Sequence, residues 1–213
     1  MPEAALVTYA VYLGLVFGLR SLLQWRATGS TGFHGVSGRP GSLEWLAGVL
    51  FVVALVLGVA APVLVMAGVA GPVAALDYPA VNWAGAALAL AGTALTLYAQ
   101  GAMGESWRIG VEQSERTELV SDGPFRLVRN PFFSAMMPAA VGLAMMVPSP
   151  VAIAGLVVLT LALELQVRVV EEPYLIRSHG SAYLSYAART GRFVPGVGRI
   201  DPGVGGTDPG AGP

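Results

Sequence analysis

Five apolar stretches, separated by short polar segments, leave this chain of 213 residues few folds other than a membrane bundle. The stretches lie at about 4–23, 43–69, 80–103, 132–147 and 151–167. A helix needs about 20 apolar residues to cross a bilayer, and somewhat fewer when neighbouring helices help. Only Pro148, Ser149 and Pro150 separate the last two stretches, so these two are expected to form a tight helical hairpin. The pattern predicts an all-α integral membrane protein with five transmembrane helices.

The scarcity of charge excludes most soluble classes of protein. Charged residues make up 12% of the chain, which is about half the share in an average protein. A soluble domain of this length could not cover its surface with so few charges, so a cytosolic globule, a disordered chain and a nucleic-acid binder are disfavoured. The chain has no Cys, and its two His residues, His34 and His179, lack companion ligands at metal-binding spacing. We therefore expect no metal site and no nucleic-acid partner.

The positions of the basic residues predict the orientation in the membrane. All of them are Arg, and each lies at the end of, or after, the first, third or fifth apolar stretch: Arg20, Arg26, Arg39, Arg108, Arg116, Arg126, Arg129, Arg168, Arg177, Arg189, Arg192 and Arg199. Asp77 is the only charged residue in the loop between the second and third stretches. Because short Arg-rich loops stay in the cytoplasm, we expect the N-terminus outside, and the C-terminus with its amphipathic helices inside. The first stretch lacks the basic residues of a secretory signal, so it is interpreted as a retained span.

The charge divides the chain into three parts. Residues 1–103 hold three spans, residues 104–200 hold the hairpin and most of the charge, and residues 201–213 form a Gly/Pro tail that is expected to be disordered. Any chemistry is expected in the two charged segments, at about 104–131 and 168–200.

One further loop, and the first part of the charged segment at 104–131, are assigned no chemistry of their own. The loop at 26–41 has glycines spaced like a phosphate-binding loop, but it joins two spans instead of following a strand. We interpret it as a flexible loop that helps to form an acceptor pocket. The linker at 104–122 is interpreted as a solvated face, because it mixes acidic residues with two arginines: Glu105, Glu112, Glu115, Glu118 and Asp122 with Arg108 and Arg116.

A first candidate site lies just before the hairpin, in the segment 123–133. Arg126 and Arg129 are three residues apart, and Pro131 suits the first turn of the next helix. Guanidinium groups beside the amides of a helix N-terminus favour a carboxylate or a phosphate. The alternative is that both arginines anchor the chain to lipid headgroups.

A second candidate site follows the last apolar stretch. On a continuing α-helix, Glu164, Arg168 and Glu171 lie on one stripe, with Glu172 at its edge. A carboxylate inside or at the edge of a span is costly unless it is paired or faces a wet cavity, so the stripe indicates a functional site. The alternative is a structural ion pair between Glu164 and Arg168.

Beyond the stripe, Pro173 is expected to open a further helix and Gly180 to end it. An amphipathic helix starting at Ser181 follows, with Tyr183 and Tyr186 three residues apart. Tyrosines at such positions commonly serve as interfacial anchors, which is the alternative to a role in a site.

Together these segments resemble the isoprenylcysteine carboxyl methyltransferase family of integral membrane enzymes. That family carries Gly-Pro-aromatic-Arg-x-x-Arg-His-Pro-x-aromatic before a helical hairpin, which is matched here at 123–133. After the hairpin come Arg-x-x-Glu-Glu-x-x-Leu, matched at 168–175, and Gly-x-x-Tyr-x-x-Tyr ending in Arg and Pro, matched at 180–195. The likeness covers about 100–200. Asn130 stands where the family usually has His, and an amide can donate a hydrogen bond but cannot titrate.

The resemblance implies S-adenosylmethionine as cofactor, and a lipophilic or prenylated acceptor drawn from the membrane, with O-methylation of a carboxylate as the first expectation. The residues implied around the cofactor are Arg126, Arg129, Asn130, Phe133, Glu171, Glu172, Tyr183 and Tyr186. Arginine would pair with the cofactor's carboxylate, the carboxylates with its ammonium and ribose, and the aromatic rings with its adenine.

Three catalytic residues are expected for this activity: Arg168, Glu164 and Glu171. Arg168 would orient an anionic lipid head, and Glu164 would hold Arg168 in place. Glu164 or Glu171 would take the proton if the acceptor is an amine. Two rival functions stay open, namely a membrane reductase using NADPH, with Arg126, Arg189 and Arg192 as phosphate donors, and a non-enzymatic scaffold.

Overall fold

The computed structural model of the chain describes residues 1–31, 35–104 and 119–201, and these ranges are helical with connecting turns. Within them the only extended pairing is an isolated bridge between Val128 and Gly191. The interpretations of His34 and Gly32, of the charged linker at 105–118 and of the tail at 202–213 lie outside the described residues.

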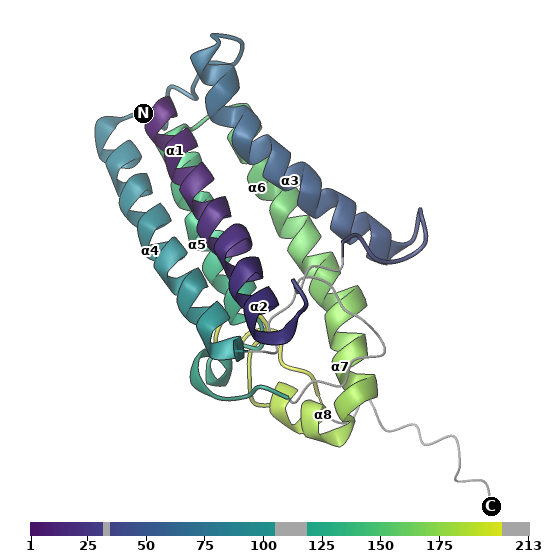
Figure 1. Cartoon of the computed structure of the whole chain (residues 1–213). Helices are drawn as coiled ribbons and strands as arrows, with labels where there is room; N and C mark the ends of the chain where they lie inside the picture. Colours follow the sequence, from purple (N-terminus) through teal and green to yellow (C-terminus); the bar gives the residue numbers. More distant parts are fainter. Residues whose placement is uncertain (32–34, 105–118, 202–213) are drawn as a thin grey trace, which may run out of the picture.

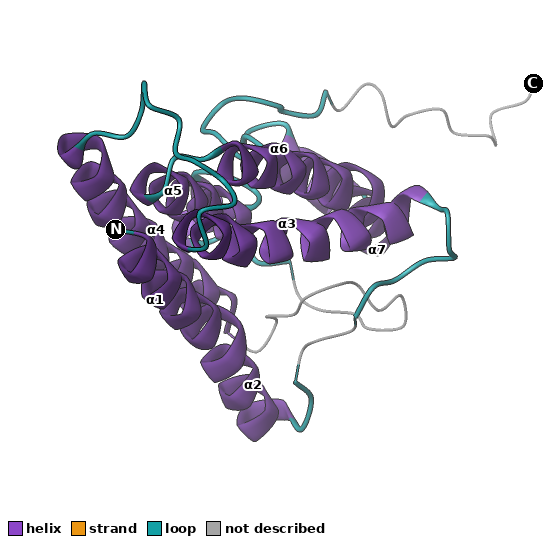
Figure 2. Cartoon of the chain, turned by 90° about the horizontal axis from the view of Figure 1, so that it is seen from above, coloured by secondary structure: helices purple, strands orange, loops and turns teal. Residues whose placement is uncertain are grey.

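The helices follow the predicted apolar stretches. In chain order they are α1 (Pro2–Leu13), the π-helical η1 (Gly14–Leu19), α2 (Arg20–Thr28), α3 (Leu43–Met66), α4 (Pro79–Met103), the 3-10 turn η3 (Gly123–Arg126), α5 (Pro131–Met146), α6 (Pro150–Leu165), the π-helical η4 (Gln166–Glu171), α7 (Glu172–His179) and α8 (Ser181–Ala187). Figure 2 shows α1 and α2 as one continuous rod. In the same way α6, η4 and α7 form one helix, so Pro173 falls within a continuing helix instead of opening a separate one.

Four of these helices are long and apolar enough to cross a membrane, as judged over the described residues: Pro2–Thr28, Leu43–Met66, Pro79–Met103 and Pro150–His179. A multi-pass integral membrane protein is therefore confirmed. The fifth, α5, is a shorter apolar helix of 16 residues, with a length of about 24 Å against about 30 Å for the hydrocarbon core.

Local sequence signals explain where the helices begin and end. Ser42 and Ser149 each precede a helix, and their hydroxyl oxygens accept hydrogen bonds from the amides of Trp45 and Ala152, both at 3.2 Å. Proline occupies the first turn of α4, α5 and α6, where a missing amide costs nothing. Gly29 ends α2 in the left-handed conformation, with φ of 78°.

The closest packing in the bundle joins α4 to α5, which Figure 1 shows side by side. A Cβ atom added to Gly92 would lie 2.3 Å from the amide nitrogen of Ala139, and one added to Gly142 would lie 2.3 Å from that of Ala89. Small residues let the two backbones touch, which is how helices associate in a membrane without a hydrophobic driving force. The short α5 is thereby fixed against a full-length helix.

The connections divide between the two ends of the bundle. The N-terminus, the α3–α4 connection and the α5–α6 turn lie at one end, and α2, α7 and α8 lie at the other (Figure 1). At the first end the two connections meet, where the amide of Val73 donates to the carbonyl of Pro148 at 2.6 Å. We call the other end the arginine-bearing end; it is formed by α2, η3, η4, α7, α8 and residues 188–201.

The α4–α5 contact gives a first prediction. Replacing Gly92 or Gly142 with Ala forces a methyl group against the opposite backbone, which cannot turn aside as a side chain can. We expect the free energy of unfolding in detergent to fall by about 1–3 kcal/mol, as it does for overpacked cores.

Gly101, on the same helix α4, provides the matched control because nothing lies within 4 Å of a Cβ added there. Gly101→Ala should leave the unfolding midpoint unchanged or raise it slightly. Equal midpoints for all three variants would contradict the close contact between α4 and α5.

Candidate functional site

The arginine-bearing end is closed by residues 123–130, α7, α8 and residues 188–201, which we call the cap. The side chain of Arg129 lies at its centre. This side chain is only 1% exposed. One of its terminal nitrogens donates to the carbonyls of Ala187 (3.1 Å) and Thr190 (2.5 Å), and the other donates to the carbonyl of Gly198 (2.9 Å) and to Glu172 Oε1 (2.5 Å). One guanidinium therefore holds residues that lie up to 69 positions further along the chain.

Glu172 joins a second arginine to this centre. Arg192 donates from Nε to Oε1 and from Nη2 to Oε2 of Glu172, both at 2.8 Å. The Glu172 side chain is 8% exposed, so its charge is balanced within the protein instead of by water. The hydrogen bond to Glu172 raises the pKa of Arg192 above its ordinary value. We call Arg129, Glu172 and Arg192 the buried ion triad.

Backbone pairing ties the start of α5 to the same cap. The amide of Arg129 donates to the carbonyl of Gly191 at 2.8 Å, and the amide and side-chain nitrogens of Asn130 donate to the carbonyl of Arg192 at 3.1 and 3.2 Å. The hydroxyl of Ser134 donates to the carbonyl of Phe193 at 2.8 Å. Asn130 thus acts here as a hydrogen-bond donor, the capacity that an amide shares with the histidine of the resembling family.

The two tyrosines of α8 belong to the core of the cap. Tyr183 and Tyr186 pack with Phe125 and Ala187 in one cluster, and the Tyr186 hydroxyl donates to the carbonyl of Phe125 at 2.6 Å. Burial raises the pKa of Tyr186 to about 12, so the hydroxyl keeps its proton at neutral pH. The tyrosines are therefore placed inside the cap, and Phe133 lies elsewhere, in the pocket described next.

A pocket beside the cap brings two carboxylates together with aromatic rings. Its polar side chains are Glu44 and Glu171, with Gln166 and Ser37, and no basic side chain lines it among the described residues. We call it the carboxylate pocket; its lining is completed by Phe17, Gly35, Val36, Gly48, Phe51, Val52, Phe132, Phe133 and Leu163. The loop at 26–41, expected to help form an acceptor pocket, contributes three of these residues.

A π-helical turn explains why neighbouring carboxylates serve different places. In η4 the backbone takes about one residue more per turn than an α-helix. Glu171 ends this turn and lines the carboxylate pocket, whereas Glu172 begins α7 and enters the buried ion triad. The single α-helical stripe expected from Glu164 to Glu171 is therefore wrong in register, because it assumed 3.6 residues per turn throughout.

The remaining predicted site residues lie outside the pocket. Arg168 donates from Nε to Glu164 at 2.5 Å, and both side chains are partly exposed, as the expected ion pair requires. Arg126 pairs with Asp122 at 3.0 Å on the exposed surface. The structure thus gathers Glu171 and Phe133 at the pocket, and Arg129, Asn130 and Glu172 in the cap. Glu164, at the end of α6, pairs with Arg168 of η4.

Among the lining residues of the carboxylate pocket that sequence reasoning missed are Glu44, Gln166 and Phe132. Glu44 carried a usable signal, because it is a carboxylate in the first turn of a long apolar helix. Gln166 and Phe132 carried none, because their orientation depends on η4 and on the start of α5.

Comparison with known families supports a methyltransferase. Residues 80–182 match the model of the phospholipid methyltransferase family, over just under half of the chain. The methyltransferases of this family use S-adenosylmethionine, so the cofactor expected from the sequence is confirmed. The narrower likeness to isoprenylcysteine carboxyl methyltransferases is not specifically supported. A comparison with curated proteins gives no match.

The buried ion triad gives a second prediction. Replacing Glu172 with Gln leaves two arginines facing each other in a site that excludes water, and breaking a buried pair typically costs about 3–5 kcal/mol. We expect residues 188–201 to detach, so that limited proteolysis cuts there much faster than in the wild type.

Asp122→Asn is the matched control, since it removes a carboxylate from the exposed pair with Arg126. Such exposed pairs contribute little to stability, so this variant should be cut at the wild-type rate. Glu172→Gln protein with wild-type resistance would show that the triad does not hold the cap.

Proposed function

We propose that this protein transfers a methyl group from S-adenosylmethionine to the amine headgroup of a membrane lipid. The observation that carries this proposal is the carboxylate pocket, in which Glu44 and Glu171 face aromatic rings beside the end of the apolar bundle. The match of residues 80–182 to a phospholipid methyltransferase family supports both the cofactor and a lipid acceptor.

The residues of the pocket fit the cofactor chemically. S-adenosylmethionine carries an ammonium group, a sulfonium and an adenosine, and supplies an electrophilic methyl group when bound. Glu171 and Gln166 offer oxygen acceptors for the ammonium and the ribose hydroxyls. The rings of Phe132 and Phe133, with centroids 5.3 Å apart, offer apolar faces for the adenine.

The charge of the pocket favours an amine acceptor over the carboxylate expected first from the sequence. Two carboxylates, Glu44 and Glu171, line the pocket, and such a lining suits a cationic acceptor group better than an anionic one. The phosphate of such a lipid would be met by Arg168, which lies three residues before Glu171 and has a partly exposed side chain.

Methylation of an amine needs a proton acceptor. A lipid amine has a pKa near that of Lys, about 10.4, so it arrives protonated and without a free electron pair. We assign to the Glu171 carboxylate the role of accepting that proton first, which leaves the electron pair on the nitrogen. The nitrogen would then form its bond to the methyl carbon as the bond from sulfur to carbon breaks and its electron pair stays on sulfur. The aromatic side chains of the pocket exclude water from this exchange.

The other predicted cofactor residues are proposed as positioning residues. Arg129, Asn130 and Glu172 hold the cap against the start of α5, next to Phe132 and Phe133. Tyr183 and Tyr186 pack in the core of the same cap, and Arg126 stays at its surface. Glu164, at the end of α6, holds Arg168 of η4.

The membrane arrangement that we propose keeps α5 as a fifth span. Its two ends reach the same ends of the bundle as those of α4 and α6 (Figure 1), and its close contact with α4 compensates for its length. With the arginine-bearing end in the cytoplasm, the N-terminus lies outside. Residues 1–103 then form an acceptor-binding part, and residues 104–200 the catalytic part.

The orientation can be tested with single cysteines, because the natural chain has none. Ala75→Cys and Ser178→Cys place exposed labels at opposite ends of the bundle. In sealed, oriented vesicles a membrane-impermeant maleimide should label only position 178 from the cytoplasmic side and only position 75 from the outer side. Labelling of both positions from one side would refute the arrangement.

The activity can be tested in nanodiscs with radiolabelled S-adenosylmethionine. We expect label in phosphatidylethanolamine, and none in a prenylated cysteine or a fatty acid. Glu171→Gln should lower the rate constant about a hundredfold or more, the usual contribution of a proton acceptor. Arg168→Ala should raise the KM for the lipid while cofactor affinity stays within a few fold.

Thermal unfolding with ligands separates the rival functions. S-adenosylhomocysteine should raise the unfolding temperature and NADPH should not, because a ligand that binds only the folded state stabilises it. Stabilisation by NADPH alone would favour a reductase, and no stabilisation by either would favour a scaffold. Label found only in the carboxylate acceptors would reverse the assignment of the amine.

A further inference from the structure

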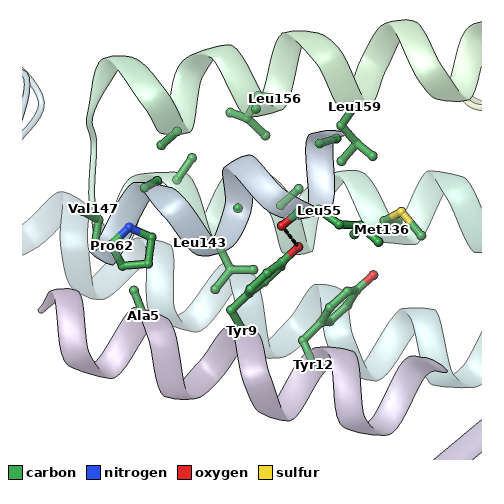
Figure 3. Close-up of a pocket in the computed structure, with 17 residues that line it drawn as sticks. Ala5, Tyr9, Tyr12, Leu55, Pro62, Met136, Leu143, Val147, Leu156 and Leu159 are labelled. Carbon is green, nitrogen blue, oxygen red and sulfur yellow. Dashed lines mark hydrogen bonds between the residues drawn. The ribbon is translucent and has the colours of Figure 1, made fainter. Parts of the chain in front are cut away.

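A second cavity lies deeper in the bundle and is almost wholly apolar (Figure 3). It is enclosed by α1, α3, α5 and α6, and the only polar side-chain atoms in its lining are the hydroxyl oxygens of Tyr9 and Tyr12. We call it the apolar cavity; its lining is Ala5, Tyr9, Tyr12, Ala54, Leu55, Gly58, Ala61, Pro62, Met136, Ala140, Leu143, Ala144, Val147, Ala152, Gly155, Leu156 and Leu159.

The space arises because small residues from three helices face one another. Ala54, Gly58, Ala140, Ala144 and Gly155 belong to α3, α5 and α6, and all of them line the cavity. The Tyr9 hydroxyl donates to the carbonyl of Leu55 at 3.0 Å, as Figure 3 shows. With this hydroxyl occupied, the cavity offers a ligand mainly hydrocarbon contacts.

The apolar cavity continues the line of the carboxylate pocket along the same helices. On α5 the pocket is lined by Phe132 and Phe133 and the cavity by Met136, about one turn further on. On α6 the corresponding residues are Leu163 and Leu159. The two spaces therefore follow each other between the same four helices, from the arginine-bearing end towards the membrane interior.

Aromatic rings mark the junction between the two spaces. Phe17 lines the carboxylate pocket and Tyr12 lines the apolar cavity, and their rings meet edge to face with centroids 6.4 Å apart. Phe51 packs against Phe17 in the same way at 6.3 Å. Both phenylalanines are only partly buried. Because a phenyl side chain makes no hydrogen bond, its rotation breaks none.

We infer that the apolar cavity binds one hydrocarbon chain of the lipid acceptor and thereby selects acceptors by chain length. This inference deepens the proposed function and rests on it: the amine head occupies the carboxylate pocket, and one chain runs past Phe17 into the cavity. A second chain of the same lipid stays in the bilayer. In a membrane the driving force is packing contact instead of removal from water, so a chain that fills the cavity is held best.

The lining sets the expected length. On α5 the lining residues run from Met136 to Val147, a rise of about 16 Å along the helix, which is comparable with a chain of about a dozen methylene groups. Chain carbons beyond that length would have no space in the cavity and would add no contacts.

Two variants that block the cavity at different depths test the expected chain length. Ala140→Phe blocks the cavity nearer to the carboxylate pocket, and Ala144→Phe blocks it one turn deeper, about 6 Å or five methylene groups further on. The matched control is Ala154→Phe, which adds the same ring to the exposed face of α6. The probes are lysophosphatidylethanolamines with chains of 8 to 18 carbons, added to the protein in nanodiscs with S-adenosylhomocysteine.

The expected result is a thermal stabilisation of wild type that rises with chain length and levels off near a dozen carbons. Ala144→Phe should level off at shorter chains, and Ala140→Phe at about five carbons fewer again, while Ala154→Phe follows wild type. Partition of longer probes into the bilayer is common to all four proteins and cancels in this comparison. Identical curves for all four would overturn the inference.

A measurement on the wild type covers the case in which a variant does not fold. A lysophosphatidylethanolamine with a diazirine at its tenth chain carbon should label peptides containing Ala140 or Leu156, and unlabelled probe should compete this labelling away. Labelling confined to lipid-facing residues such as Leu90, without competition, would overturn the inference. Methyl transfer that persists with no chain-length dependence would refute the inference and leave the proposed function intact, whereas chain binding without methyl transfer would refute the function.

Discussion

Glu172 accepts hydrogen bonds from two arginines in the interior of the cap, and the arrangement of the arginine-bearing end depends on that carboxylate. Arg129 comes from the segment before α5, Arg192 from the segment after α8, and Glu172 from the helix between them. Removing two guanidinium groups and a carboxylate from water is costly. The cost is offset here by charge-assisted bonds and by carbonyl acceptors from three further residues. The same contacts bring the end of the described chain back onto the start of α5.

The π-helical turn gives that cap a neighbour with different chemistry. Without η4, Glu171 and Glu172 would follow α-helical spacing from Glu164 onward, and both could not serve their present places. The turn directs one carboxylate to a pocket lined by aromatic rings and the other to an internal ion triad. A carboxylate inside an ion triad and a carboxylate that lines a pocket thus stand on adjacent residues. Turns of this kind recur at functional sites for this reason, since they change the face of a helix without interrupting it.

The elements of the fold were accessible from the sequence because length and hydropathy determine membrane helices directly. The bounds of α4 and α5 differ from the apolar stretches by about one residue, and Gly180 ends α7 as expected. The site was accessible only in part. The pairing of Glu164 with Arg168 followed from i, i+4 spacing, but the pairing of Arg129 with Glu172 spans 43 residues and depends on how the helices pack. Gln166 could not be recognised, because a pocket between four helices leaves no pattern in any one of them. Glu44 could have been recognised, because it is a carboxylate in the first turn of a long apolar helix.

The contact between α4 and α5 also decides which parts of the molecule can move. Two backbones that touch at Gly92 and Gly142 interlock, so the helices cannot slide past each other or rotate without a steric clash. α5 forms one wall of the apolar cavity, and α4 stands behind it. That wall is therefore held rigid. Helix movements that would admit a lipid from the side of the bundle are left to the other walls of the cavity, which α1, α3 and α6 form.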